Sequence, residues 1–370
     1  MIIGYEAKRI FHNASGLGNY GRNLIRTLAS NLPKNEYHLY NPKAATYPFA
    51  EYLPNVKEHQ PPIKNGLYAN LWRQRFVSDR CTKDGIEIFH GLSQELPFGL
   101  KKKGIKSVVS VHDAIFMRYP HLYKSIDRTI YKRKLRSACR RADKIVAISE
   151  QTKNDLVHFF NIEPHFIEVI YQGVNPIYWK EFLDEEPDDV RQRFDLPKKF
   201  ALFVGTLEER KGVDKIIEAQ LQTGIPVVYI GRPTAFWESC KNRPEYESIQ
   251  HLIHTPMVRL DEDLAKIYRI AELFIYPSIF EGFGIPVLEA LISKTPVITS
   301  NTSSLPEVAG PSSRLVNPTK QDEISGTLQH VWEDETLRME MAETGYTFAQ
   351  KFGDKAIAQK WETLYQSLMS

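Results

Sequence analysis

The sequence predicts an α/β protein made of two doubly wound, Rossmann-like domains. Its 370 residues are more than one domain usually holds and enough for two domains that each bury a core. Short apolar runs alternate with segments of helical periodicity, which is typical of a parallel sheet covered by helices on both faces. Glycines and polar residues follow directly on several of these runs. Such folds bind ligands at the carboxyl ends of their strands, so these loops hold the candidate site.

The composition is that of an ordinary globular protein. Hydrophobic residues make up 42% and charged residues 25%, and the net charge is only +3. Cys81, Cys139 and Cys240 lie far apart and form no C-x-x-C pair, so we expect free thiols in a reducing compartment. Neither a signal-peptide apolar region nor a run of membrane-spanning length is visible. We therefore expect a cytoplasmic location.

The N-terminal half begins with a predicted strand at Ile2–Ala7 and an amphipathic helix at Asn19–Ala29. Further strands are predicted at Tyr37–Tyr40, Ile86–His90, Ser107–Val111 and Lys144–Ile148. Two histidines stand at strand ends, His90 and His112. Most histidines are packed or solvated, but the run before His112 delivers it to a strand end with Asp113 following at once. His112 is therefore the candidate we favour.

A literal G-x-G-x-x-G pattern spans Gly16 to Gly21, in a predicted loop before the first helix. In a dinucleotide-binding unit these glycines follow directly on the strand, whereas about nine residues intervene here. A nicotinamide site, a bare turn and a glycine loop that approaches a diphosphate all remain open.

The stretch Lys124–Lys144 is basic and amphipathic. Its cations are Lys124, Arg128, Lys132, Arg133, Lys134, Arg136, Arg140, Arg141 and Lys144, opposed only by Asp127 and Asp143. A solvated helix face is the plain interpretation, and docking on an anionic membrane surface is the functional one. No stacking or groove-reading motif accompanies the charge, so we expect no nucleic-acid partner.

The second half opens with a buried strand at Phe200–Val204, followed by Gly205 and the adjacent cations Arg210 and Lys211. A glycine turn with two cations before a helix makes an anion cradle, because Arg grips two phosphate oxygens and Lys supplies a point charge. Another strand is predicted at Val227–Gly231. Asp261–Glu262–Asp263 invites a metal interpretation, but helical periodicity follows, and acids at a helix start explain the triplet. We expect no metal site.

The segment from Phe274 to Ala290 carries two glutamates, Glu281 and Glu289, separated by seven residues. A strand at Leu273–Tyr276 precedes it, and a helix with proline in its first turn begins near Pro286. The glycines between them let a ligand approach the backbone, and the helix start favours a phosphate. A carboxylate beside a phosphate would repel it, so neutral sugar hydroxyls are the expected partners of the two acids. The pattern indicates a sugar nucleotide. A strand at Val297–Thr299 and helices at Asp322–Glu333, Glu335–Phe352 and Asp354–Leu368 complete the chain.

These motifs resemble those of the retaining GT-B-type glycosyltransferases of group 1, over nearly the whole chain. The resemblance implies two domains facing each other across a cleft, at residues 1–176 and 198–353, joined by a linker at 177–197. It also implies that the helix at 354–370 packs back on the first, acceptor-binding domain. By this resemblance Glu281 meets the donor sugar, Glu289 the ribose, and His112 the transferred sugar. Arg210 and Lys211 would neutralise the pyrophosphate, with Gly16, Gly18, Gly205, Phe283, Gly284 and Ile285 also contacting the donor.

The resemblance implies a metal-independent hexosyltransferase that needs no cofactor and retains the anomeric configuration. Mannose from GDP-mannose is the guess for the donor, and the acceptor is a glycan or lipid-linked saccharide in bacterial surface polysaccharide assembly. The enzyme would be cytoplasmic or peripheral at the inner face of the plasma membrane. Three alternatives stay open: a nucleotide-sugar 2-epimerase of the same fold, an NAD-dependent oxidoreductase, and a non-catalytic sugar-nucleotide-binding protein.

Overall fold

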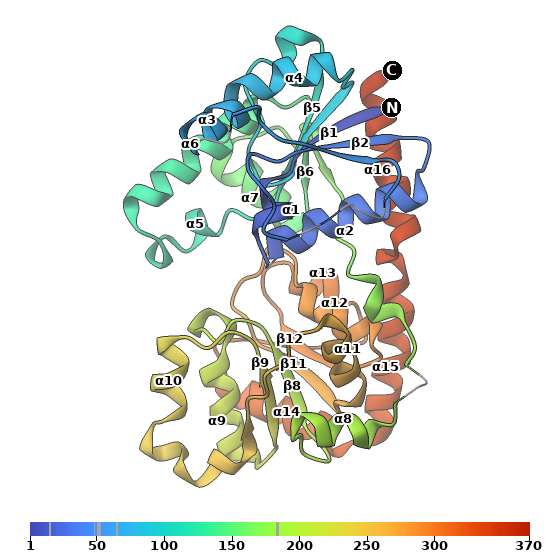
Figure 1. Ribbon diagram of the computed structural model, residues 1–370. Coiled ribbons are helices and arrows are strands. Elements are labelled where there is room, and N and C mark those ends of the chain that lie inside the picture. Colours follow the sequence, from blue (N-terminus) through green and yellow to red (C-terminus); the bar gives the residue numbers. More distant parts are fainter. Residues whose placement is uncertain (15, 48, 50–52, 64–65, 183–184) are drawn as a thin grey trace. The chain divides into compact units, whose positions relative to one another are not determined.

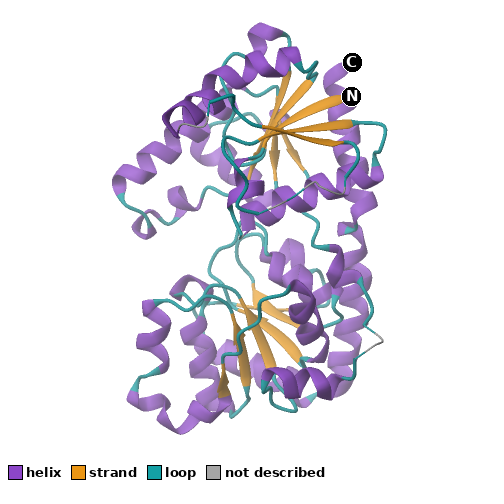
Figure 2. Cartoon of the chain, viewed as in Figure 1, coloured by secondary structure: helices purple, strands orange, loops and turns teal. Residues whose placement is uncertain are grey.

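Two parallel sheets organise the chain, each in its own unit (Figure 1). The computed structural model describes residues 1–14, 16–47, 49, 53–63, 66–182 and 185–370. The first unit comprises Met1–Gly173 with Phe352–Ser370, and the second comprises Val174–Lys351. Helices cover both faces of each sheet (Figure 2). The predicted class of two doubly wound α/β domains is confirmed.

The sheet of the first unit has seven parallel strands in the order β3-β2-β1-β4-β5-β6-β7. They are β1 (Ile2–Glu6), β2 (Glu36–Tyr40), β3 (Val56–His59), β4 (Ile88–Gly91), β5 (Lys106–Val111), β6 (Lys144–Ala147) and β7 (Ile167–Val169). All five predicted strands of this half are present, with ends shifted by at most two residues. The edge strands β3 and β7 were not predicted, because their sequences are short and carry charged residues.

The sheet of the second unit has six parallel strands in the order β10-β9-β8-β11-β12-β13. They are β8 (Ala201–Val204), β9 (Val227–Ile230), β10 (Ile253–His254), β11 (Leu273–Tyr276), β12 (Val297–Ser300) and β13 (Arg314–Val316). The central strands β8 and β11 are buried throughout, as continuous apolar runs in parallel sheets usually are. The four predicted strands are confirmed, and the short edge strands β10 and β13 were again missed.

Helices join the strands of the first unit. They are α1 (Lys8–His12), α2 (Gly16–Asn31), α3 (Gly66–Leu71), the π-helical turn η1 (Trp72–Phe76), α4 (Val77–Lys83), η2 (Lys101–Lys103), α5 (Ile115–Arg118), η3 (Pro120–Leu122), α6 (Ser125–Arg141), α7 (Glu150–Phe160), η4 (Pro164–Phe166) and α16 (Asp354–Met369). Ser149 caps α7 by accepting a hydrogen bond from the Thr152 N–H at 3.0 Å, as its sequence position predicts.

The helices of the second unit begin directly after the boundary. They are η5 (Pro176–Trp179), α8 (Pro187–Phe194), η6 (Glu209–Lys211), α9 (Val213–Thr223), α10 (Ala235–Lys241), η7 (Pro244–Leu252), α11 (Asp261–Ile270), α12 (Ile285–Ile292), α13 (Leu305–Ala309), α14 (Gln321–Glu333) and α15 (Glu335–Ala349), and η8 (Gln350–Phe352) lies at the second boundary. The predicted linker at 177–197 therefore contains α8 and all of η5 except its first residue. Its residues Leu183 and Asp184 lie outside the described part.

The last helix, α16, belongs to the first unit, although it follows the second in sequence. The Tyr365 hydroxyl lies 3.1 Å from the Tyr5 hydroxyl, and Thr27 of α2 donates to Asp354 at 2.9 Å. Trp361 and Tyr365 are almost completely buried. Burial of two large aromatic side chains stabilises this docking by several kcal/mol.

The glycine pattern is not a loop, and that prediction is wrong. The residues from Gly16 to Gly21 form the first turns of α2. A Cβ atom on Gly18 would lie 1.8 Å from the Asn13 carbonyl oxygen, so this glycine lets the preceding backbone pack directly on the helix. Around Gly16 there is open space. Close helix packing thus explains Gly18, and the arrangement differs from a dinucleotide-binding loop.

All three cysteines are free, as expected, and all three are buried. Within the described ranges, no helix combines the length and the apolar character needed to cross a membrane.

Candidate active site

Arg210 and Lys211 lie just beyond the carboxyl end of β8, in the 3-10 turn η6. Lys211 folds back over Gly205, and a Cβ atom at Gly205 would lie only 3.2 Å from its Nζ atom. The Lys211 ammonium also contacts Tyr276, donating to its hydroxyl and lying 5.0 Å from the ring centroid. The absence of a side chain at Gly205 therefore gives Lys211 room to approach the end of β11.

Glu281 follows β11 and gathers these cations. Its Oε1 atom accepts hydrogen bonds from Arg210 at 3.0 Å, from the Tyr276 hydroxyl at 2.9 Å and from the Ser278 hydroxyl at 2.9 Å. The Lys211 Nζ atom lies 3.4 Å from the same oxygen. The neighbouring strands β8 and β11 thus bring Arg210, Lys211 and Glu281 into one ion-pair cluster. The expectation of neutral partners for Glu281 did not foresee this pairing, because it considered the loop without the neighbouring strand end.

The cluster is charged at neutral pH. Burial alone would raise the pKa of Glu281, but Lys211 and Arg210 outweigh it and lower that pKa to about 2. Burial opposes the charge on Arg210 too, and the Glu281 carboxylate prevails and raises its pKa. Arg210 is also held by Glu208 at 2.6 Å. Two cations and two carboxylates therefore share a space in which their side chains are 12% to 35% exposed.

The start of α12 lies between the two glutamates of the segment. Gly284 is its N-cap with φ of 116°, a conformation that L side chains rarely adopt, and an added Cβ would meet Leu305 at 2.9 Å. The Ser304 hydroxyl donates to the carbonyl oxygens of Glu281 and Phe283, which fixes the loop. Phe283 itself is buried, so only its backbone is suited to a ligand. The first N–H groups of a helix attract anions.

Glu289, on α12, instead has tyrosine hydroxyls beside it and the carboxylate of Asp261 nearby. The Tyr268 hydroxyl of α11 donates to its Oε2 atom at 3.1 Å. Burial and, to a smaller extent, the charge of Asp261 raise the pKa of Glu289 to about 8, although hydrogen bonds from Tyr268 and Tyr178 pull in the opposite direction. This carboxyl group is therefore mostly protonated at pH 7 in the structure described.

The acidic triplet at the start of α11 makes contacts of its own. Asp261 accepts a hydrogen bond from Asn175 at 2.9 Å, Glu262 pairs with Lys266 at 3.1 Å, and Asp263 pairs with Arg193 at 3.2 Å. Acids in a first helical turn also complement the helix dipole. These partners fit the predicted role of the triplet as a helix start.

His112 follows β5 in the first unit and is 6% exposed. Its Nε2 atom lies 2.7 Å from the Leu92 carbonyl oxygen, and its ring packs edge-on against Tyr20 with centroids 4.6 Å apart. Burial lowers the pKa of His112 to about 4, so the ring is neutral. Because a carbonyl only accepts, Nε2 carries the proton and Nδ1 is left as an acceptor.

His90, the second histidine considered, is a core residue. It is fully buried, and its ring nitrogens lie 2.8 Å from the Tyr365 and Ser110 hydroxyls. Burial lowers the pKa of His90 to about 3. It therefore joins α16 to the sheet and is not placed to contact a substrate.

A cavity of about 310 Å³ in the first unit is lined by Asp113, the residue after His112. Its walls come from the start of α2, the loops after β4 and β5, and the helices α5 and α6. The lining residues are Arg9, Leu17, Ser93, Gln94, Glu95, Asp113, Phe116, Tyr123, Tyr131, Lys134 and Leu135. Aromatic rings with a few charged and amide groups are typical of a small-molecule site.

Family models match both units. Residues 184–348 match glycosyl transferases group 1, and residues 14–177 match Glycosyltransferase Family 4. The chain belongs to the group 1 glycosyltransferases. This glycosyltransferase is 26% identical to the O-antigen chain mannosyltransferase B of Escherichia coli, over 95% of this chain and 96% of that protein. It is 27% identical to the serotype-specific mannosyltransferase WbdA of Escherichia coli, over 72% of this chain but only 34% of that protein.

Solved structures share the fold of this glycosyltransferase. Sucrose-phosphate synthase from Thermosynechococcus elongatus superposes with a TM-score of 0.80 at 20% identity, covering 100% of this chain and 99% of that one. WaaG, a glycosyltransferase involved in lipopolysaccharide biosynthesis, gives 0.72 at 17% identity, with 97% and 98% covered. The GT-B fold and the group 1 family are confirmed, while retention, independence of metal, the two-glutamate motif and the roles assigned to single residues stay predictions.

Sequence reasoning missed the hydroxyl groups around the glutamates. Tyr276 and Ser278 bind Glu281, and Tyr268 binds Glu289. Tyr276 and Ser278 stand at the end of β11, so their position was a usable signal. Tyr268 lies on a different helix, and nothing local in the sequence connects it with Glu289.

Proposed function

We propose that this glycosyltransferase moves a hexosyl group from a nucleoside diphosphate sugar to an acceptor hydroxyl with retention at the anomeric carbon. The ion-pair cluster of Arg210, Lys211 and Glu281 at the ends of β8 and β11 carries the proposal. GDP-mannose is the first donor to test, because the relatives named above include mannosyltransferases. A glycan or lipid-linked saccharide of bacterial surface polysaccharide assembly is the proposed acceptor, since one of those relatives acts on an O-antigen chain.

In the proposed reaction the bond between the anomeric carbon and the diphosphate oxygen breaks, and negative charge grows on the leaving diphosphate. Arg210, Lys211 and the start of α12 stabilise that charge more in the transition state than in the ground state. The acceptor oxygen attacks from the same face, and its proton passes to the departing phosphate oxygen. Charge, proton and leaving group are then accounted for by donor, acceptor and these side chains, without a metal or cofactor.

The two glutamates hold the donor in this proposal. Glu281 binds hydroxyls of the sugar while it keeps both cations in place, and Glu289 binds the ribose. Gly205, Phe283, Gly284 and Ile285 provide backbone for the phosphates, and Gly16 and Gly18 belong to a helix start whose Leu17 lines the cavity of the first unit. His112 offers its Nδ1 atom to a hydroxyl of the transferred sugar.

The acceptor is assigned to the cavity that Asp113 lines in the first unit. Tyr123 and Tyr131 provide surfaces on which a sugar ring can stack, and Glu95 and Asp113 accept hydrogen bonds from hydroxyls. Glu95 is fixed by Arg73 at 2.6 Å and by Lys134 at 2.9 Å. A rigid carboxylate beside aromatic rings is suited to a neutral saccharide.

Helix α6 supports a lipid-linked acceptor. Among its cations, Lys134 pairs with Glu95, and Arg141 donates hydrogen bonds to the carbonyl oxygens of Leu96 and Pro97. Its N-terminal half instead exposes apolar side chains, with Ile126 67% and Ile130 44% exposed on one face. A basic helix with exposed apolar residues is suited to an anionic membrane surface. We include peripheral binding at the inner face of the plasma membrane in the proposal.

The donor is tested first by thermal stabilisation. A panel of UDP-, GDP- and ADP-sugars is screened, because a ligand that prefers the folded state raises the melting temperature. The stabilising donor is then incubated with bacterial glycan and lipid-linked acceptors, and the anomeric configuration of the product is read by NMR. Diphosphate release with a retained configuration supports the proposal. Inversion overturns retention, an isomerised donor without acceptor indicates the epimerase, and binding without diphosphate release indicates a non-catalytic protein.

Membrane binding has a separate test. Co-sedimentation with vesicles of phosphatidylglycerol and phosphatidylethanolamine should fall in Ile126→Asp and stay unchanged in Met257→Asp, which alters an equally exposed side chain (73%) in the other unit. Equal sedimentation of both variants would remove α6 from the proposal and leave the sugar transfer intact.

A further inference from the structure

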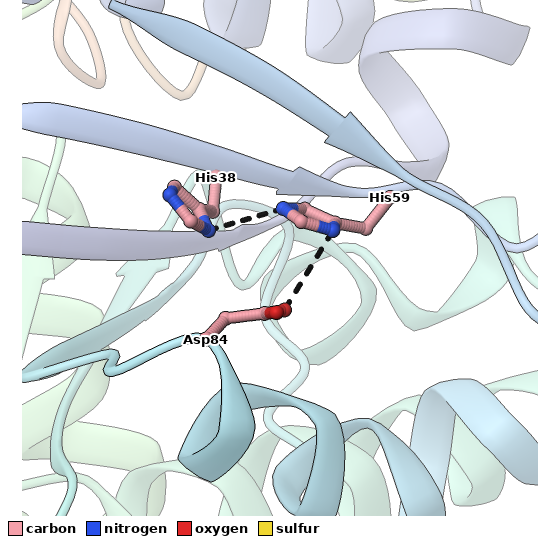
Figure 3. Close-up of side chains that lie close together, drawn as sticks. All are labelled: His38, His59 and Asp84. Atoms are coloured by element: carbon pink, nitrogen blue, oxygen red, sulfur yellow. Dashed lines mark hydrogen bonds and ion pairs between the residues drawn. The ribbon is translucent and has the colours of Figure 1, made fainter.

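Three side chains of the first unit lie close together at the edge of the sheet formed by β3 (Figure 3). This edge is remote from β5, which His112 follows. His38 lies in β2, His59 ends β3, and Asp84 follows α4. Because Tyr40 pairs with His59 and His38 with Lys57, the two histidines are diagonal neighbours on one face of adjacent strands. Strand pairing, and not sequence proximity, therefore creates the cluster.

The distances within the cluster suit a shared ligand. His59 Nε2 lies 3.0 Å from His38 Nδ1, and His59 Nδ1 lies 3.6 Å from an Asp84 oxygen. One potential ligand atom of each residue lies within 4.8 Å of those of the other two. The side chains are 7%, 15% and 11% exposed for His38, His59 and Asp84, which leaves an ion a path from solvent.

The hydrogen bond between the two rings opens when an ion binds. Two adjacent ring nitrogens 3.0 Å apart share one proton when no ion is bound. A tautomer change at His59 moves that proton to Nδ1 and leaves lone pairs on His38 Nδ1 and His59 Nε2. Asp84 lies beside Nδ1 of His59, so its carboxylate turns toward the two free nitrogens to become the third ligand.

Some of the neighbouring side chains favour binding of an ion, and one competes with it. Glu36 lies 3.6 Å from the outer nitrogen of His38, as a carboxylate commonly does behind a metal-binding imidazole. The Tyr40 hydroxyl, at 2.9 Å, holds Asp84 in position. Arg80 competes for Asp84 at 2.8 Å, but its side chain is 50% exposed and can turn into solvent. Because Asp84 is only 11% exposed, breaking this partly buried ion pair is the cost of binding the ion.

We propose that His38, His59 and Asp84 bind a divalent transition-metal ion of the zinc class, with water completing a tetrahedral shell. Two imidazoles and a carboxylate are a ligand set that such ions take, whereas Mg²⁺ and Ca²⁺ prefer oxygen ligands alone. The ion links the edge strand β3, the strand β2 and the end of α4. Since edge strands are the least supported part of a sheet, it stabilises the first unit and is independent of the proposed donor site.

The test uses the full chain, stripped of metal by a chelator. Wild type should take up one Zn²⁺ per chain in equilibrium dialysis, melt at a higher temperature in ZnCl2 than in MgCl2, and give the strong visible absorption of tetrahedral Co²⁺. His158→Gln alters an exposed histidine of the same unit and should behave like wild type. His59→Gln should lose the bound ion, the thermal shift and the absorption.

Asp84→Asn keeps the size of the side chain and should weaken Zn²⁺ binding at least about tenfold. Each thermal shift is measured against the same variant without metal, so a less stable variant remains informative. Undiminished uptake by His59→Gln, or no saturable uptake by wild type, overturns the proposal and leaves the cluster a hydrogen-bonded chain.

Discussion

Glu281 and Glu289 belong to one loop-and-helix segment, with seven residues between them, and their surroundings are opposite. Arg210 and Lys211 surround Glu281 and keep it ionised, whereas Glu289 has tyrosine hydroxyls for neighbours and stays protonated near pH 7. Both are partly buried, so burial alone does not explain the difference. The nearby charges decide it, because the turn after β8 brings two cations to Glu281, whereas α11 brings the carboxylate of Asp261 near Glu289.

The two glutamates are suited to two different tasks in binding a sugar nucleotide. A fixed anion between two cations holds those cations in position before any phosphate arrives, which is preorganisation. A neutral carboxyl group does not repel an approaching diphosphate, and it gains charge only if ligand hydroxyls stabilise the anion. One motif can therefore provide a permanent charge and a conditional one.

The largest expected effect comes from removing the permanent charge. Glu281→Gln should lower turnover about 10²- to 10³-fold, because the cations lose their shared partner and the sugar loses its acceptor of hydrogen bonds. Lys211→Ala should lower turnover strongly as well, because it removes a charge from the leaving diphosphate. Initial rates at saturating donor measure this, with circular dichroism to verify folding. Near-normal turnover in both variants would refute the assigned roles.

A second prediction concerns stability and pH. The pKa of Glu289 in the folded chain, about 8, lies above its ordinary value of 4.5, so its stabilising effect is complete below pH 4.5 and is lost as pH rises through 8. The free energy of unfolding should fall by about 1.4 kcal/mol per pH unit at most within this window from this group. Glu289→Gln should flatten that part of the profile, measured by chemical denaturation.

Glu281→Gln is the matched control for this profile. In wild type the pKa of Glu281, about 2, lies below the ordinary value of 4.5. The contribution of Glu281 to the free energy of unfolding is therefore present above pH 4.5 and is lost only as pH falls toward 2. Between pH 5 and pH 8 this variant should run parallel to wild type. A Glu289→Gln profile parallel to wild type would show that Glu289 is already ionised at pH 7.

A third prediction concerns donor binding. If ribose hydroxyls stabilise ionised Glu289, binding of the nucleotide sugar at pH 7 releases a fraction of a proton, and affinity rises by at most tenfold per pH unit up to about pH 8. Calorimetry in two buffers of different ionisation enthalpy measures that proton. Release should vanish in Glu289→Gln and persist in Glu281→Gln. Identical buffer dependence in wild type and Glu289→Gln would remove Glu289 from the nucleotide site.

Much of this arrangement followed from the sequence. Continuous apolar runs such as Leu273–Tyr276 gave central strands whose ends could be located, and with them Arg210, Lys211 and Glu281 at one edge of one sheet. Residues that follow directly on a strand can therefore be identified from the local sequence. The opposite protonation of the two glutamates could not, because the raised pKa of Glu289 depends on its burial and on the nearby charge of Asp261, both of which arise from tertiary packing.

The errors have the same origin. The pattern from Gly16 to Gly21 looks like a loop in isolation, but contact between Gly18 and the Asn13 backbone extends the helix over it. The pair His38 and His59 is 21 residues apart and meets only through the register of β2 and β3, an edge strand that the sequence did not indicate. Long-range packing, unlike strand position, leaves no local pattern.

The smallest expected effect tests a single hydroxyl. Tyr268→Phe removes the 3.1 Å hydrogen bond to Glu289 and should lower the free energy of unfolding by about 1 kcal/mol. Because that bond lowers the pKa of Glu289, its loss should raise the pKa further and move the proton release on donor binding to higher pH. Tyr276→Phe is the matching variant at Glu281. Two cations still keep Glu281 ionised in it, so the pH dependence of proton release on donor binding should stay as in wild type. A shift in Tyr276→Phe with none in Tyr268→Phe would reverse the contrast between the two glutamates.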